Sequence, residues 1–176
     1  VLTELKNFEM LGTILRFSGT HLIPLNPVYP HQWVLGFRYG ANTTMTNERA
    51  VGIGLIPAQY FHTLGGDQNL RGFSRNELTG AGSGARTSVF SSVELRLAKT
   101  LPVWMEPFAF YDFGFTGNNS MSLESIFYQS PGLGMRVQSP FGVFRTTFAH
   151  GFVTPKPDPK LKREHFQFFL SFGKEF

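Results

Sequence analysis

The feature that most constrains this chain is an alternation of apolar and polar residues that recurs in seven separate segments. A period of two places successive side chains on opposite faces of an extended strand. In WVLGFRYGA, Trp33, Phe37 and Tyr39 share one face and Arg38 lies on the other. No amphipathic helix intervenes, and the first ten residues alternate too poorly to hold more than part of an eighth strand. We predict an all-β chain with strands at 12–19, 33–41, 91–98, 108–115, 132–138, 143–149 and 165–176.

The composition and the strand lengths favour a lipid environment for one face of this sheet. Charged residues make up 16% of the chain, below the roughly 25% of soluble domains. No apolar run is long enough for a transmembrane helix. Many strands approach the 9–11 residues that cross a bilayer at a tilt. A water-soluble β-domain would alternate in a similar way and stays open as the alternative.

The connections between the strands differ in length as they do in outer-membrane barrels. SPFG at 139–142 is a tight turn, whereas 42–63, 74–88, 116–128 and 152–164 are long and polar. Because lipid does not tolerate an open sheet edge, we predict a closed transmembrane antiparallel β-barrel. The lipid-facing row is expected to include Leu15, Phe37, Leu95, Phe113, Leu133 and Phe168.

Five motifs resemble those of the outer membrane protein 85 superfamily, and they occur in that family's order. They are the Arg-Gly-Phe loop, VELRL, FYDFG, SPFGVFRTTFA and the terminal FQFFLSFGKEF. The family includes the BamA and TamA assembly factors and the two-partner secretion transporters. The resemblance runs from about Gly12 to Phe176. It implies that 1–176 is the carboxyl-terminal part of a barrel domain, seven to eight strands of sixteen, without the amino-terminal transport-associated domains.

The resemblance also implies that a loop at about 60–88 folds into the lumen. Leu70, Arg71, Gly72 and Phe73 match the motif at its tip, and Glu94 and Asp112 match the acids that receive the arginine. Such a loop needs glycines for backbone bends, which we assign to Gly65, Gly66 and Gly72. An eight-stranded barrel has room only for side chains, so the loop requires a larger barrel or another chain that completes it.

The terminal strand resembles the β-signal that outer-membrane assembly machinery recognises by strand pairing. Its outward row would be Phe166, Phe168, Leu170, Phe172 and Phe176. Phe169 interrupts the inward polar row and is expected to fill lumen space or to pack on the loop. The resemblance implies a weak seam between this strand and the first barrel strand, and Gly173 matches a glycine near the kink.

No catalytic constellation emerges from the sequence, and we predict neither an enzyme nor a cofactor. Cysteine is absent, and the five histidines at 21, 31, 62, 150 and 165 lack metal-ligand spacing. GAGSG at 80–84 lacks the Lys and Ser/Thr of a phosphate-binding loop. The net charge of +4 is modest for a nucleic-acid binder and suits anionic lipid headgroups.

The predicted function is insertion or translocation of polypeptides in the bacterial outer membrane. The expected partners are outer-membrane lipid and lipopolysaccharide, unfolded outer-membrane or secreted polypeptides, and accessory assembly lipoproteins. Two alternatives remain open at this point. One is a barrel that anchors a fused patatin-like or metallophosphatase enzyme, and the other is a passive pore.

Overall fold

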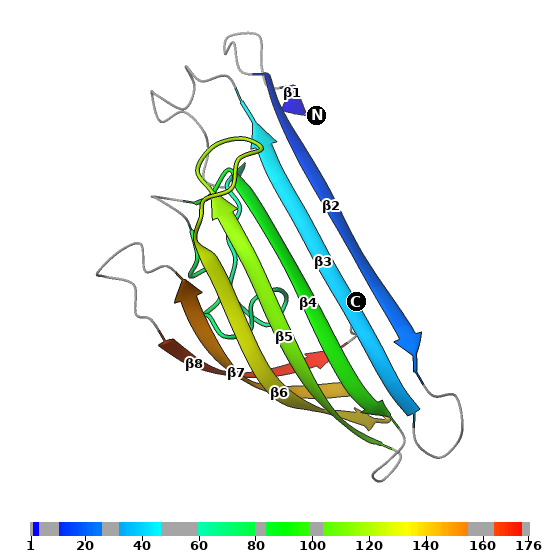
Figure 1. Cartoon of the computed structure of the whole chain (residues 1–176). Helices are drawn as coiled ribbons and strands as arrows, with labels where there is room; N and C mark the ends of the chain where they lie inside the picture. Colours follow the sequence, from blue (N-terminus) through cyan, green and yellow to red (C-terminus); the bar gives the residue numbers. More distant parts are fainter. Residues whose placement is uncertain are drawn as a thin grey trace.

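The described part of the chain is a single antiparallel sheet in which each strand pairs with the next (Figure 1). A computed structural model describes residues 2–3, 11–25, 32–46, 60–79, 84–98, 104–154 and 164–173. The strands are β1 (Leu2–Thr3), β2 (Leu11–Pro24), β3 (Gln32–Met45), β4 (Thr87–Ala98), β5 (Met105–Gly117), β6 (Phe127–Ser139), β7 (Gly142–Thr154) and β8 (Glu164–Gly173). Among these residues, no helix is long and apolar enough to cross a membrane.

The seven predicted strands are present, and most are longer than the alternation indicates. β3 continues to Met45 instead of ending at 41, and β4 begins at Thr87 instead of 91. Polar residues such as Thr43 and Thr87 hide these ends from a hydrophobic pattern, yet their backbones pair across the two strands. The long strands β2 to β8 contain 10–14 residues, which is enough to span a bilayer.

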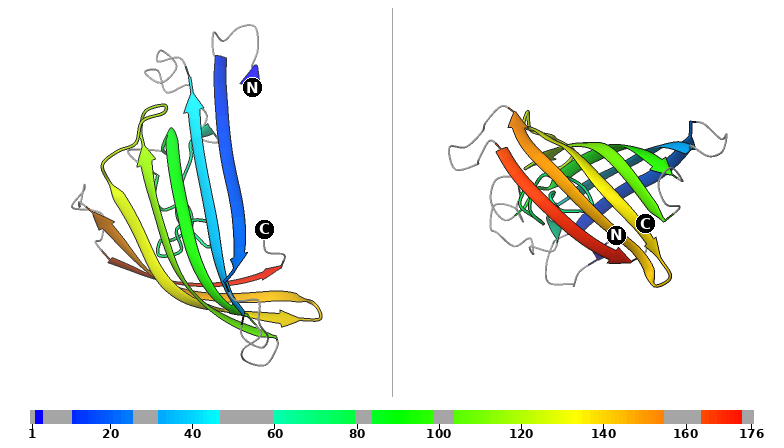
Figure 2. Two further views of the ribbon diagram at one scale, coloured as in Figure 1. Left: turned by 45° about the vertical axis from the view of Figure 1, so that its right-hand side comes forward. Right: turned by 90° about the horizontal axis from the view of Figure 1, so that it is seen from below.

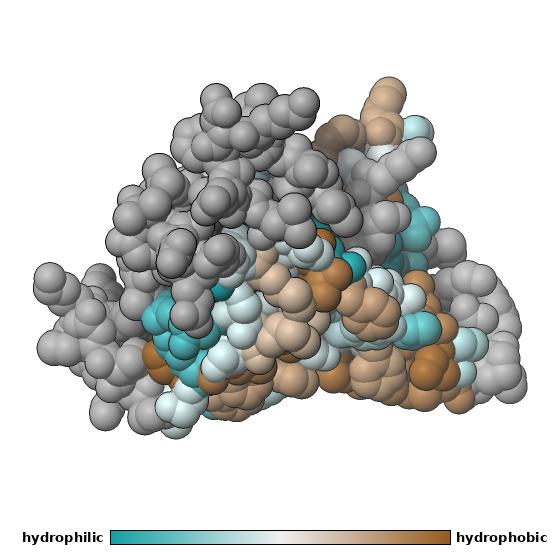
Figure 3. All heavy atoms as spheres, turned by 90° about the horizontal axis from the view of Figure 1, so that it is seen from above, coloured by the Kyte–Doolittle hydropathy of each residue, from teal (hydrophilic) through white to brown (hydrophobic). Residues whose placement is uncertain are grey.

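The sheet is strongly curved and has a convex and a concave face (Figure 2). Exposed apolar side chains gather on the convex face, and they include the predicted Leu15, Leu95, Leu133 and Phe168. In Figure 3 hydrophobic residues gather along the side of the molecule that faces the viewer in Figure 1. The alternation thus assigns the two faces correctly.

The eight strands do not close on themselves within the described residues. β8 is hydrogen-bonded to β7 alone, and β1 covers only Leu11 and Gly12 of β2. The described strands therefore form an open sheet with an edge at each end of the strand order.

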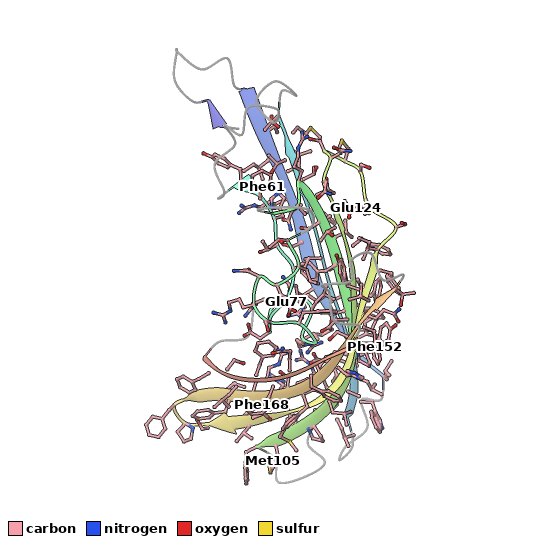
Figure 4. All side chains as sticks on the ribbon, turned by 90° about the vertical axis from the view of Figure 1, so that its left-hand side faces the viewer. Phe61, Glu77, Met105, Glu124, Phe152 and Phe168 are labelled. Atoms are coloured by element: carbon pink, nitrogen blue, oxygen red, sulfur yellow. The ribbon has the colours of Figure 1, made fainter. Side chains whose placement is uncertain are left out.

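The connections lie at two opposite ends of the strands and take different courses. Ser139 and Gly142 flank the predicted tight turn. At the other end, the segment 60–79 packs on the concave side. The connection between β5 and β6 lies on the convex side, so that Phe61 and Glu77 fall on one side of the strands and Glu124 on the other (Figure 4).

Candidate functional site

The segment 60–79 forms a compact loop on the concave face of the sheet. One isolated bridge, Leu64 with Leu78, joins its two arms, and a second, His62 with Ala85, joins it to the residues just before β4. The side chain of His62 is also within hydrogen-bond distance of Thr44, with 3.0 Å between Nε2 and Oγ1. The loop is therefore tied both to itself and to the end of β3.

A tight turn leads into the Arg-Gly-Phe motif. Gly65 and Gly66 have φ angles of 107° and 111°, a region that strongly favours glycine. A Cβ at Gly65 would also lie 2.3 Å from the carbonyl oxygen of Ser74. The side-chain oxygen of Asn69 accepts hydrogen bonds from the amides of Gly65 and Leu70, each at 2.7 Å. These contacts fix the backbone immediately before Arg71.

Arg71 is fully buried against β4 and β5. Its Nε and Nη2 donate to the two carboxylate oxygens of Asp112 at 2.8 and 2.6 Å, and its backbone amide donates to the same carboxylate at 3.1 Å. Nη1 donates to Glu94 at 2.8 Å and Nη2 to the hydroxyl of Ser92 at 2.9 Å. The structure thus brings together the arginine and both acids singled out in the sequence.

The electrostatics of this cluster favour the charged form of Arg71. Burial by itself would lower the pKa of Arg71, but the carboxylates of Asp112 and Glu94 outweigh it and raise that pKa above its ordinary value. The guanidinium carbon also lies 3.4 Å from the centroid of the Phe110 ring, a cation–π contact. The guanidinium of Arg71 is therefore a cation held by the carboxylates of Asp112 and Glu94 and by the face of the Phe110 ring.

Two further arginines surround Glu94, and neither was predicted from the sequence to belong to the site. Nε of Arg96 donates to Glu94 at 2.6 Å, and Nη2 of Arg145 lies 3.7 Å from the same carboxylate. Both were visible on the polar face of the alternation. What the alternation lacks is the register, which decides which strands place their polar residues side by side.

Gly72 lies in a turn, as expected, with the amide of Phe73 donating to the carbonyl oxygen of Leu70 at 3.2 Å. Its φ is not positive, so the turn itself does not require glycine there. Glycine is required at this position by a close approach to the sheet. A Cβ at Gly72 would lie 2.6 Å from the Cα and N atoms of Gly151 on β7, and 2.6 Å from Oγ of Ser130. A Cβ at Gly151 would in turn meet the carbonyl oxygen of Gly72 at 2.4 Å. Two glycines thus let the loop backbone lie directly on the strand.

Apolar side chains complete the contact between the loop and the sheet. Phe73 is fully buried and packs edge-on against Tyr128 of β6, with ring centroids 5.9 Å apart. Leu70 is also fully buried and reaches β5, where a Cβ at Gly114 would lie 3.1 Å from its Cδ1. The buried cluster consists of Leu64, Leu70, Phe73, Leu78, Tyr128 and Val153.

The selected residues of the terminal strand occupy a different part of the sheet. Four of them are exposed on the convex face, namely Phe166, Phe168, Leu170 and Phe172. Phe168 and Phe172 pack in tilted geometry against Phe148 and Phe144 of β7, with ring centroids 4.7 and 4.6 Å apart. Gly173 has a φ of 134° and open space where a Cβ would be. Phe176 lies outside the described residues.

Metal chemistry has no support in the described ranges, which contain no group of three or more His, Cys, Asp or Glu side chains that could hold an ion. The contacts of the site hold the loop in place on the sheet. A loop is clamped by charge, close backbone contact and apolar packing to the concave side of a membrane-type sheet.

A curved antiparallel sheet with an apolar convex face and a charged concave face is typical of the wall of an outer-membrane β-barrel. Residues 13–176 match the Omp85 superfamily domain, and the chain belongs to this family. A search of the curated proteins finds no match to the chain. Among solved structures, it is similar to BamA from Haemophilus ducreyi lacking POTRA domains 1–3, with 20% identity and a TM-score of 0.60. That similarity covers 93% of this chain and 35% of the BamA chain, so this chain spans about a third of that structure.

Proposed function

We propose that residues 1–176 form the carboxyl-terminal part of a sixteen-stranded outer-membrane barrel that inserts or translocates polypeptides. The burial of Arg71 between Asp112 and Glu94 on the concave face is the observation that carries this proposal. On closure of the barrel, the concave face becomes the lumen, and the loop at about 60–88 lies inside it. Further strands of the same polypeptide or of another chain complete the wall.

The proposed mechanism uses the free edge of the terminal strand and needs no covalent step. An unpaired strand edge is a template for pairing with another strand, and β8 pairs only with β7 among the described residues. A substrate strand pairs with this edge when the seam with the first barrel strand opens. The exposed Phe166, Phe168, Leu170 and Phe172 keep the edge at the lipid boundary. Gly173 weakens the last pairs because its backbone leaves the usual strand conformation.

The docked loop makes a passive pore a poor alternative, because its buried core of Leu64, Leu70, Phe73 and Leu78 occupies the concave side of the sheet.

An anchoring barrel for a fused enzyme predicts a different phenotype from an assembly or secretion barrel. Depletion of the full-length protein in cells separates these roles. We expect folded outer-membrane barrels or secreted polypeptides to decline, whereas an anchor would leave both at their normal levels.

Strand pairing is tested directly by a photo-cross-linking amino acid. We place it at Leu170 on β8 and, as a matched control, at Leu133 on β6, since both side chains are about two-thirds exposed on the convex face. The proposal expects substrate cross-links from position 170 in excess of those from 133. Equal substrate cross-linking at the two positions would contradict the role of the β8 edge.

A further inference from the structure

The connection between β5 and β6 takes an unexpected course, because it folds back onto the convex face of the sheet. In Figure 1 it curls over the end of β4 toward β3, and in Figure 4 it lies on the side of the strands opposite to the loop that carries Arg71. A long polar connection at this end could equally have extended away from the sheet. Its return to the convex side therefore depends on specific contacts with the sheet.

The seat of this connection is a row of small residues that point outward from three adjacent strands. Thr43 pairs with Thr87, and Thr87 pairs with Gly117. The hydroxyl of Thr87 donates to the carbonyl oxygen of Asn119 at 2.8 Å, and the amide of Met121 donates to the hydroxyl of Thr43 at 3.1 Å. The connection is thus hydrogen-bonded to Thr43 of β3 and Thr87 of β4, whose side chains lie on the same face of the sheet as the convex apolar row.

Gly117 shows that the return is tight. A Cβ built on Gly117 would lie 1.8 Å from the carbonyl oxygen of Ser122 and 3.0 Å from the Cα of Leu123. Any larger residue at 117 would force the connection off the sheet. On the strand-end side, the hydroxyl of Ser120 donates to the carbonyl oxygen of Thr44 at 2.7 Å. Backbone and side-chain contacts therefore hold the segment from both sides.

The residue held at the tip is apolar, exposed and in an unusual backbone conformation. Met121 has a φ of 54° and is 72% exposed, and Leu123 nearby is 45% exposed. A bulky residue with positive φ is a backbone outlier, and such strain points to a functional constraint on the position. Glycine or asparagine would suit this backbone better, so the methionine side chain is presented here at a conformational cost.

The surroundings of the tip indicate its partner. Residues 119–123 carry no charge, and the row of the sheet immediately before the Thr43–Thr87–Gly117 seat consists of Ala41, Val89 and Phe115. Phe115 stacks on Phe127 at 5.0 Å and continues the apolar band to β6. The tip is therefore contiguous with the face that contacts lipid in an outer-membrane barrel, at the border where apolar and hydroxyl side chains meet.

We propose that residues 118–126 form a membrane hook, whose Met121 and Leu123 insert among the acyl chains of the lipid around the convex face. The hook fixes the depth of this edge of the barrel in the bilayer. The inference rests on the proposed placement of the convex face in lipid, and it adds a specific lipid-contact site to it.

Spin labelling tests the hook, because the chain has no cysteine of its own. A nitroxide is attached at Met121→Cys in the full-length protein, with any other cysteine removed, and the protein is placed in lipid vesicles. Collision rates with oxygen, which concentrates in lipid, and with a water-soluble nickel complex report the surroundings. Leu133→Cys on the convex face serves as the lipid reference, and Arg75→Cys, on the exposed rim of the concave loop, as the water reference.

We expect the ratio of oxygen to nickel collisions at 121 to lie well above that at 75 and on the side of 133. We also expect Gly117→Ala, combined with the label at 121, to shift this ratio toward the water value, because the added Cβ displaces the hook. A water-like ratio at 121 with a lipid-like ratio at 133 overturns the hook and leaves the barrel intact. A water-like ratio at 133 would instead contradict the membrane placement itself.

Discussion

Asp112→Asn is the substitution that most directly tests how the loop is held on the sheet. The Asp112 carboxylate is fully buried and accepts four hydrogen bonds, three from Arg71 and one from the hydroxyl of Ser92. Asparagine preserves the shape but removes the negative charge and replaces one acceptor oxygen with a donor group. Arg71 then keeps a full charge in a buried site with Glu94 as its remaining anionic partner.

The expected cost follows from these contacts. Breaking a buried ion pair by removing one partner costs about 3–5 kcal/mol. Because Glu94 still contacts the guanidinium, we expect the lower end of this range, about 3 kcal/mol. That corresponds to a loss of roughly a hundredfold in the equilibrium between docked and released loop. Leu70 and Phe73 remain buried apolar anchors worth about 1.5–3 kcal/mol each, so the loop stays mostly docked but opens more often.

Amide hydrogen exchange of the full-length protein in a lipid nanodisc measures this opening. We expect exchange in the segment 70–73 to accelerate by about two orders of magnitude in Asp112→Asn. Asp67→Asn is the matched control, because Asp67 pairs at 3.3 Å with an Arg75 side chain that is largely exposed. Such a pair contributes less than about 1 kcal/mol. Equal exchange in the two variants would refute the reasoning that the buried charge pair holds the loop.

Three further perturbations probe other contacts of the site. Gly72→Ala should loosen the loop, because its Cβ would lie 2.6 Å from Gly151 backbone atoms; unchanged exchange at 70–73 would contradict this packing. Burial, and then the charge of Arg16, lower the pKa of His62 from 6.5, so its contribution to stability is complete above pH 6.5 and is lost as the pH falls through the lowered value. The thermal midpoint should therefore decline below pH 6.5 in the wild type and less so in His62→Gln, and parallel pH profiles would argue against this. Gly173→Val should stiffen the end of β8 and make the seam open less often, since valine disfavours the φ of 134°; unaltered cross-linking of 172–176 to the neighbouring strand, together with unaltered activity, would exclude this role.

The sequence predicts the sheet well, because the two faces of most strands differ in polarity; Phe110 on the face of Asp112 is an exception. Parity alone places Glu94 and Asp112 on the face opposite to Leu95 and Phe113. The family resemblance adds the pairing of Arg71 with acids on that face. The ends of the strands are harder to predict from the sequence, because residues such as Thr43 carry no hydrophobic signal while their backbones still pair.

Two features of the site depend on register and close approach, which no local pattern contains. Gly72 looks like a turn glycine in the sequence and does lie in a turn, but the residue that excludes a side chain there is Gly151, far along the chain. The course of the β5–β6 connection is equally hidden, because Thr43, Thr87 and Gly117 form a seat only after three strands have aligned. Both cases are tertiary contacts between small residues, and small residues are also common in ordinary loops.

Four consecutive residues of the loop, Arg71 to Ser74, together contact every strand from β4 to β8, and this explains how a short motif can hold a large loop. Arg71 contacts β4 and β5, Gly72 lies on β7, Phe73 packs on β6, and Oγ of Ser74 accepts a hydrogen bond from Gln167 of β8 at 3.1 Å. All these strands belong to the same chain as the loop. The partner groups of the motif therefore assemble when this sheet forms, whatever completes the barrel. The hydrogen bond to β8 is exposed, whereas Arg71 and Phe73 are fully buried against the sheet. The motif is therefore held mainly by its buried contacts with β4 to β7, and β8 is held by its own pairing with β7.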